Sequence, residues 1–128
     1  MVLTYHTVIQ IYRIYDNICE YYGMSSHYNW GHAPKLILTY VDYPNSNVHG
    51  EFSSYDRSII LNSCGASWET IIKTLIHEYQ HYLQHPGWYT RYENMFNYAN
   101  NPYEIQAETV AERDWKHFKA VCRSGTMP

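Results

Sequence analysis

Residues 67–85 carry apolar side chains over so broad a helical face that other parts of the chain must cover this segment. Its apolar positions follow a 3.6-residue period: Ile71, Ile72, Leu75, Ile76, Tyr79 and Leu83. Ser67 is a suitable N-cap for such a helix, and Pro86-Gly87 ends it. A chain of 128 residues, 45% of them apolar, can supply this cover within one domain. We therefore predict a single domain over residues 1–128, built around a buried helix.

A further helix and three short strands are predicted before this segment. A 3.6-residue apolar period predicts an amphipathic helix at residues 5–22. Residues 35–41 and 58–62 are rich in β-branched and other apolar side chains, so we expect two inner strands there. The small polar residues of 48–55 suit an edge strand better. This order predicts an α+β fold with an N-terminal helix, a small mixed three-stranded sheet, and helices after the sheet.

The composition argues against several classes of function. Nine lysines and arginines against twelve aspartates and glutamates give a net charge of -3, which predicts no nucleic-acid partner and no polybasic membrane patch. No apolar run approaches the roughly 18 residues of a membrane span, and the N-terminus does not resemble a signal peptide. Three widely spaced cysteines suggest neither a disulfide framework nor a C-x-x-C metal site. We therefore expect a cytoplasmic protein without membrane contact.

The predicted buried helix contains His77-Glu78-Tyr79-Gln80-His81, an H-E-x-x-H motif. The i,i+4 spacing places both imidazoles on one face, where their nitrogens can bind one zinc ion at about 2.0 to 2.1 Å. Glu78 lies beside the first ligand, where it can hold and deprotonate a water at the metal. Eight histidines and eight glutamates would produce the motif by chance only about 0.03 times in this chain. We therefore predict that His77 and His81 bind Zn²⁺ and that Glu78 is the catalytic base.

A third zinc ligand is predicted in a last helix. Asn101 and Glu104 suit the N-cap and N3 positions of this helix, which we expect to reach about Cys122. Glu104 and Glu108 lie one turn apart, so one carboxylate could bind the metal while the other supports a ligand. Alternatively, both are ordinary acids near the start of a helix that complement its dipole. We favour the ligand interpretation, because His85 does not stand at the spacing of the third histidine of metzincins.

The two motifs together resemble those of the gluzincin metallopeptidases. In that family, H-E-x-x-H on an active-site helix is followed by E-x-x-x-D, or a close variant, on a glutamate helix; Glu104-Ile105-Gln106-Ala107-Glu108 is similar to this second pattern. The sequence around Glu104 also looks like the CAAX-prenyl-protease branch, but the transmembrane helices of that branch are missing. In size and element order the chain most resembles the minigluzincins, which are soluble single-domain forms. The resemblance covers roughly residues 48–118.

The resemblance implies a zincin-like fold and a zinc-dependent metalloendopeptidase. It makes His77, His81 and Glu104 the zinc ligands and Glu78 the general base and acid. Glu108 stands where the family usually has Asp, and the resemblance implies that it supports a ligand histidine from the second shell.

The resemblance also implies where a peptide or protein substrate binds. An extended substrate would pair with the strand around residues 50–54, which makes Gly50 and Phe52 the predicted substrate-binding residues. A further side chain is needed to stabilise the oxyanion of the reaction. The candidates are Arg113, His117, Tyr89, Tyr92 and Tyr103.

Two other functions remain open at this level. In the first, the metal would hold two helices together in a structural or latent zinc-binding module that has no catalytic activity. Because protein ligands fill all positions of a structural zinc site, ligation by Cys64 or Cys122 would support this alternative. A peptidase acting on nucleic-acid-bound proteins, like the SprT-like family, is the other, and the acidic balance of charge counts against it. The presence of Glu78 favours catalysis, since a structural site needs no base.

Overall fold

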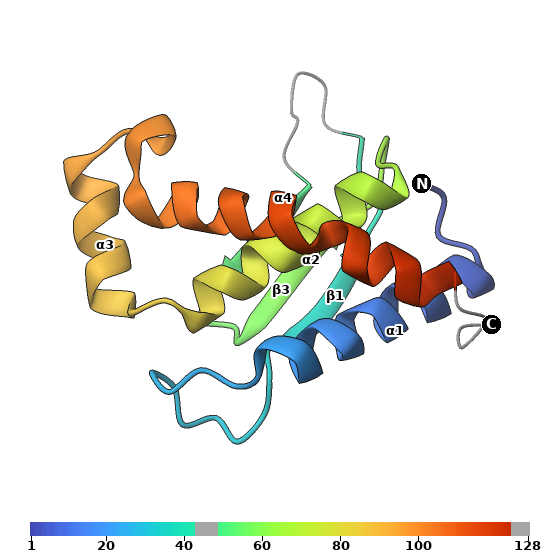
Figure 1. Ribbon diagram of the computed structural model, residues 1–128, viewed down its shortest axis with the longest axis horizontal. Helices are drawn as coiled ribbons and strands as arrows, with labels where there is room; N and C mark the ends of the chain where they lie inside the picture. Colours follow the sequence, from blue (N-terminus) through green and yellow to red (C-terminus); the bar gives the residue numbers. More distant parts are fainter. Residues whose placement is uncertain (43–48, 124–128) are drawn as a thin grey trace.

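The computed structural model describes residues 1–42 and 49–123, with side chains as far as Ala120. These residues form one mixed sheet, four α-helices and a single 3₁₀ turn (Figure 1). In chain order the elements are α1 (Tyr5–Tyr22), β1 (Lys35–Thr39), β2 (Gly50–Ser53), β3 (Ser58–Asn62), α2 (Trp68–Leu83), α3 (Pro86–Met95), η1 (Tyr98–Asn100) and α4 (Pro102–Arg123). The predicted α+β fold class and its layout are confirmed.

The sheet has the strand order β1-β3-β2. β1 runs parallel to β3 and β2 runs antiparallel to it, which makes the sheet mixed as predicted. β3 is the central strand and β2 lies at an edge, as the sequence indicated. The expectation that residues 35–41 form an inner strand is wrong, because β1 occupies the other edge of the described sheet and ends at Thr39.

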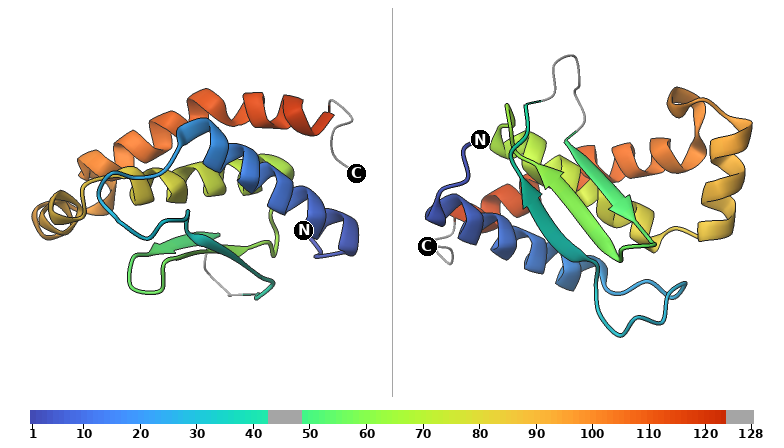
Figure 2. Two further views of the ribbon diagram at one scale, coloured as in Figure 1. Left: turned by 90° about the horizontal axis from the view of Figure 1, so that it is seen from below. Right: turned by 180° about the vertical axis from the view of Figure 1, so that it is seen from behind.

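The position of the helices explains why β1 is an edge strand although its sequence suggested an inner one. They cover only one face of the sheet, as the two views of Figure 2 show. Leu36 faces this layer and is buried, whereas Ile37, the next residue, is 37% exposed. A short apolar run looks the same in sequence whether one or both of its faces are covered, so the pattern could not distinguish an edge strand from a central one.

α2 lies at the centre of the molecule. α1 and α2 pack on the sheet, and α4 lies along the other side of α2 (Figures 1 and 2). The predicted burial of α2 is confirmed: Ile71, Ile72, Leu75 and Ile76 are almost fully inaccessible. Its predicted start is confirmed too, because the Ser67 side chain accepts a hydrogen bond from the N–H of Thr70. α2 is therefore in contact with the sheet, with α1 and with α4.

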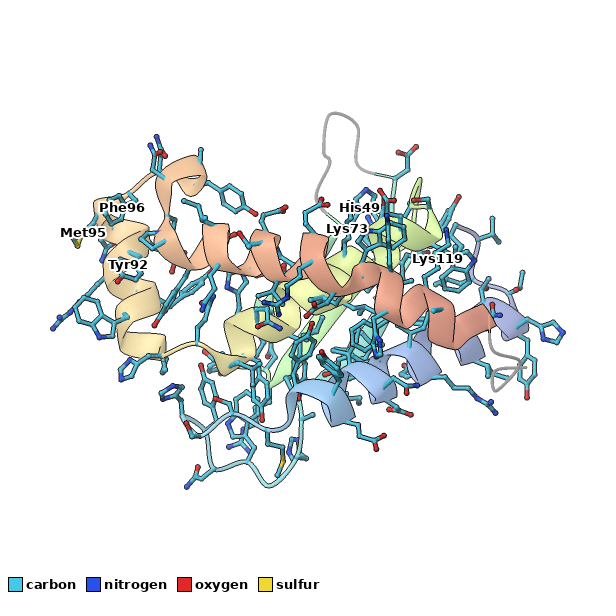
Figure 3. All side chains as sticks on the ribbon, viewed as in Figure 1. His49, Lys73, Tyr92, Met95, Phe96 and Lys119 are labelled. Atoms are coloured by element: carbon cyan, nitrogen blue, oxygen red, sulfur yellow. The ribbon has the colours of Figure 1, made fainter. Side chains whose placement is uncertain are left out.

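α3 differs from the other helices because none of its residues is buried. It projects at one end of the molecule, and Tyr92, Met95 and Phe96 lie on this projecting part (Figure 3). None of the described helices combines the length and the apolar sequence needed to cross a membrane.

Candidate metal centre

His77 and His81 lie one turn apart on α2 and face α4. Both are buried, at 7% and 6% exposure, and their ring centroids are 4.8 Å apart. Each imidazole directs its Nε2 atom toward the same carboxylate, that of Glu104. The helical spacing of the motif has therefore brought two nitrogen donors to one point.

Glu104 reaches this point from the first turn of α4. Asn101 caps the helix, since its Oδ1 accepts a hydrogen bond from the N–H of Tyr103 at 2.9 Å. The Glu104 side chain does not return to the cap as in a capping box, because its two oxygens contact the histidines instead. Oε2 lies 3.1 Å from Nε2 of His77, and Oε1 lies 2.7 Å from Nε2 of His81. Donors around a tetrahedral zinc with bonds of about 2.0 to 2.1 Å lie about 3.3 Å apart, so this spacing is close to that of a zinc site.

Glu104 and His81 each stabilise the charged form of the other. Burial acts to raise the pKa of Glu104, but hydrogen bonds from His77 and His81 lower it well below its usual range. Burial acts to lower the pKa of His81, but the hydrogen bond to Glu104 and the charge of Glu78 raise it. The carboxylate is therefore ionised at neutral pH, in the state that binds a metal.

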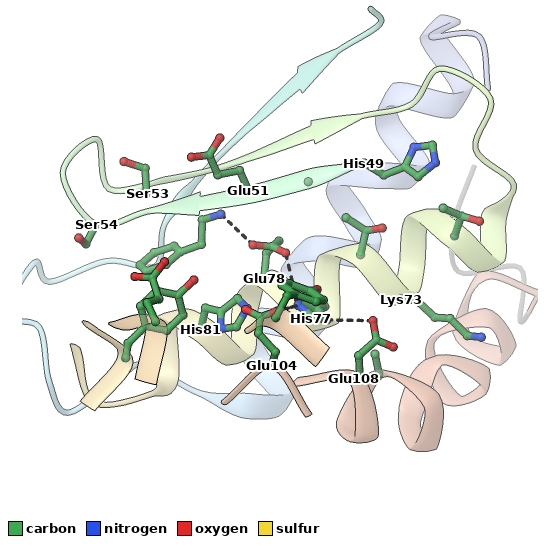
Figure 4. A pocket seen from close by; sticks show the side chains of 18 of the residues that line it. His49, Glu51, Ser53, Ser54, Lys73, His77, Glu78, His81, Glu104 and Glu108 are labelled. Atoms are coloured by element: carbon green, nitrogen blue, oxygen red, sulfur yellow. Dashed lines mark hydrogen bonds and ion pairs between the residues drawn. The ribbon is translucent and has the colours of Figure 1, made fainter. Parts of the chain in front are cut away.

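Glu78 lies on α2 beside the first histidine and points toward β2 (Figure 4). Its Oε2 is 3.8 Å from Nε2 of His77, and its Oε1 accepts a hydrogen bond from the backbone N–H of Phe52 at 2.9 Å. Burial raises the pKa of Glu78, although both histidines and the Phe52 N–H act in the opposite direction. A carboxylate with a raised pKa is a stronger proton acceptor than an exposed one.

The outer edge of β2 forms one side of the site. The N–H of Asn62 donates to the carbonyl of His49 at 2.7 Å, which makes these two residues a hydrogen-bonded pair. Because such pairs alternate along an antiparallel ladder, the backbone groups of Gly50 and Phe52 point away from β3. The Phe52 N–H already has Glu78 as its partner.

Gly50 allows β2 to approach α2 closely. A Cβ atom at this position would overlap Cγ2 of Thr74 and would lie 3.3 Å from Cγ of Glu78. A side chain there would force the strand and the helix apart. Gly50 therefore has a packing role, whatever its part in substrate binding.

The predicted metal ligands, base, supporting acid and substrate-binding residues all line one open cavity of about 950 Å³. Its lining includes His77, Glu78, His81, Glu104, Glu108, Gly50 and Phe52. Glu108 is exposed, and its Oε1 lies 3.5 Å from Nδ1 of His77 (Figure 4). Residues distant in sequence thus meet at the place where the motifs indicated a metal.

Of the five oxyanion candidates, only Tyr89 lines this cavity. Its ring packs edge-on against His81 with centroids 5.1 Å apart, and burial, together with nearby carboxylates, raises its pKa. The hydroxyl is therefore protonated at neutral pH and can donate. The others lie elsewhere: Arg113 pairs with Asp114, His117 packs on Tyr21 and Phe118, and Tyr92 and Tyr103 pack on each other.

The two cysteines considered as alternative ligands do not support a closed site. Cys64 follows β3 and contacts Tyr40, outside the residues that line the cavity. The side chain of Cys122 lies outside the described residues.

Two contributors to the site were missed in the sequence. Gln84 accepts a 2.7 Å hydrogen bond from Nδ1 of His81, and its position three residues after His81, on the same helical face, could have indicated this. Tyr98 hydrogen-bonds Glu104 through its hydroxyl. No local pattern pointed to Tyr98, because η1 brings it to the site from outside both motifs.

Comparison with models of protein families, with curated proteins and with solved structures gives no match for this chain. The function of the cavity therefore has to be argued from its geometry and donor chemistry. His77, Glu78 and His81 offer atoms within 4.8 Å of one another that could hold a metal ion. The two imidazole nitrogens with the nearer carboxylate, that of Glu104, form a donor set that suits zinc.

Proposed function

We propose that the chain is a zinc-dependent metalloendopeptidase of the gluzincin type. One observation carries this proposal: the carboxylate of Glu104 lies between Nε2 of His77 and Nε2 of His81, and a second carboxylate, Glu78, stands beside them without joining that bridge. A structural zinc site would need ligands only. The additional carboxylate, which is largely buried and borders an open cavity, supports hydrolysis.

The ligands and the base have distinct parts in this proposal. His77, His81 and Glu104 would hold Zn²⁺, which when bound supplies a Lewis acid that polarises a carbonyl and lowers the pKa of a water. Glu78 accepts the proton of the attacking water and later passes it to the leaving amine. Its burial suits this task, because it raises the pKa of the carboxylate toward neutral pH.

The substrate would be an extended peptide segment that pairs with β2. The backbone groups of Gly50 and Phe52 point away from β3 toward the cavity, as substrate pairing on a strand edge requires. Tyr89 can donate a hydrogen bond to the oxyanion, because its hydroxyl is protonated and borders the same cavity.

A latent zinc-binding module is the second candidate. The observation in its favour is the hydrogen bond from Phe52 to Glu78, which ties the proposed base to the strand that would receive the substrate. A peptide carbonyl that takes over this N–H would free Glu78. Without such a peptide, the carboxylate stays tethered to β2.

Zinc reconstitution combined with a cleavage assay tests the proposal. Metal-free protein is titrated with zinc, and bound zinc is measured by mass spectrometry while unfolded casein is offered as substrate. We expect about one zinc per chain and cleavage that a chelator abolishes. Zinc binding without cleavage of casein or of a peptide library would favour the latent module. A folded protein that takes up no zinc would refute both.

A further inference from the structure

Gln84 is a buried residue that links His81 to the first turn of α4. It is the C-cap residue of α2, and its backbone has an extended conformation. Its side chain is buried next to His81. Its Oε1 lies 2.7 Å from Nδ1 of His81, and its Nε2 donates to the carbonyl of Tyr103 and to Oε1 of Gln106, both at 2.9 Å. Gln84 thus contacts one proposed ligand and the residue that precedes another, Glu104.

The partners of Gln84 determine how its amide is oriented. The carbonyl oxygen of Tyr103 can only accept a hydrogen bond, so the amide group facing it must be the NH₂. The opposite atom, which faces His81, is then the amide oxygen, and this atom can only accept. Nδ1 of His81 must therefore carry a proton. The nitrogen left to offer a lone pair to a metal is Nε2, the atom that already faces Glu104.

Among the residues that the structure describes, His77 has no comparable partner. Nδ1 of His77 lies 3.5 Å from Glu108, whose side chain is 61% exposed. That separation is longer than a good hydrogen bond, and solvent screens the charge of an exposed carboxylate. Gln84, in contrast, is only 7% exposed, and its amide is satisfied on both sides.

We infer that Gln84 is a positioning residue of the metal site, which fixes the ring of His81 so that Nε2 binds the metal and sets the first turn of α4 against it. This inference rests on the proposed zinc site. It assigns to a buried neutral amide the main supporting part that the sequence assigned to Glu108. A neutral partner orients the imidazole without adding negative charge to a site that already has two carboxylates.

Three variants separate positioning from packing. Gln84→Leu removes the acceptor for Nδ1, Gln84→Glu retains an acceptor but loses the donor to Tyr103, and Gln106→Ala removes one amide contact while leaving the Tyr103 carbonyl to orient Gln84. Zinc affinity is measured by competition with a chromophoric chelator. We expect a loss of about 10- to 100-fold for Gln84→Leu, as is typical when the partner of a ligand histidine is removed. Gln84→Glu should stay within about 10-fold of the parent protein, and Gln106→Ala should match the parent.

A second measurement does not depend on metal binding. In ¹⁵N-histidine-labelled, metal-free protein, the Nδ1–H proton of His81 should exchange slowly with water in the parent protein and in Gln106→Ala, and much faster in Gln84→Leu. An equal exchange rate in Gln84→Leu would overturn the inference, as would unchanged zinc affinity. A loss of affinity as large in Gln106→Ala as in Gln84→Leu would assign the effect to packing. If the parent protein binds no zinc, the proposed function fails, while the exchange rates still test Gln84. If Gln84→Leu does not fold, Gln84→Met, which keeps the length of the side chain but has no amide oxygen, takes its place in both measurements.

Discussion

The backbone N–H of Phe52 donates a 2.9 Å hydrogen bond to Oε1 of Glu78. This bond joins the edge strand β2 to the residue that we assign as the base. It forms because β2 approaches α2 so closely that Gly50 has no room for a side chain. The placement of the proposed base and that of the proposed substrate-binding edge therefore depend on the same strand.

Substituting Gly50 by alanine should separate β2 from α2. The new methyl group would overlap Cγ2 of Thr74, so we expect a loss of about 1 to 3 kcal/mol in the free energy of unfolding, measured with urea. At a position with free space the same change is often stabilising, because it restricts the unfolded chain. The sign of the effect is therefore informative.

Thr74→Ala provides the matched control for this prediction. Removing the Thr74 methyl group relieves the closest contact, so Gly50→Ala should cost clearly less in the Thr74→Ala background than in the parent protein. An equal cost in both backgrounds would show that the close approach of β2 and α2 is not what requires glycine.

Glu104 and Glu108 should differ strongly in their effect on zinc binding. Glu104→Ala removes a carboxylate that contacts both histidines, so we expect zinc affinity to fall by more than about 100-fold. Glu108→Ala should cost about 10-fold or less, because its carboxylate is exposed and 3.5 Å from His77. Zinc titration of both variants measures the difference.

Glu112→Ala is the control for these two variants, since Glu112 is an exposed acid on the same helix that pairs with Lys73. Its zinc affinity should equal that of the parent protein. If Glu108→Ala proves worse than Glu104→Ala, the ligand is Glu108. Three silent variants would return both acids to a role in the helix dipole.

Asp114 should make the link between α1 and α4 sensitive to acid. Two hydrogen bonds from Arg113 lower the pKa of Asp114, burial opposes this, and the Tyr22 hydroxyl adds a 2.6 Å hydrogen bond. A lowered pKa in the folded state gives stability that is complete above the unfolded value of about 3.9 and lost as the pH falls through the folded value. Asp114→Asn should therefore be less stable than the parent protein at pH 7, by about 1 kcal/mol.

Urea unfolding at pH 7 and at pH 3 measures this contribution. The difference between Asp114→Asn and the parent protein should narrow at pH 3, because below about 3.9 the unfolded chain takes up a proton at Asp114 more readily than the folded protein, whose carboxyl has a lowered pKa. Tyr22→Phe retains the charge and the Arg113 contact, so its difference from the parent should depend less on pH. If Asp114→Asn lowers the free energy of unfolding equally at both pH values, the Asp114 carboxylate does not provide the stability assigned to it.

Local patterns in the sequence predicted the helices well and the edges of the sheet less well. The apolar period predicted α1, and the cap at Ser67 predicted the start of α2. These signals lie within the segments whose structure they predict. The edge position of β1 depends on how the rest of the chain packs around it, and the sequence of residues 35–39 alone does not show that packing.

The candidate site shows the same division. The spacing within each motif placed His77 beside His81, and the helix start at Asn101 placed Glu104 in a first turn. Neither pattern indicated Gln84, whose role depends on the Tyr103 carbonyl across the α2–α4 interface. Contacts of this kind depend on the register of two helices, which a single sequence does not display.

Cleavage by Glu78→Gln at matched zinc occupancy tests the central claim most directly. The amide preserves the shape of the side chain but cannot accept the proton of the attacking water. Parent and variant are loaded with one zinc per chain, verified by mass spectrometry, and given the same unfolded casein. We predict that zinc binding stays within a few-fold, as expected of a residue that is not a ligand, while cleavage falls by at least about 100-fold. Equal rates of cleavage by the parent protein and Glu78→Gln would contradict the account.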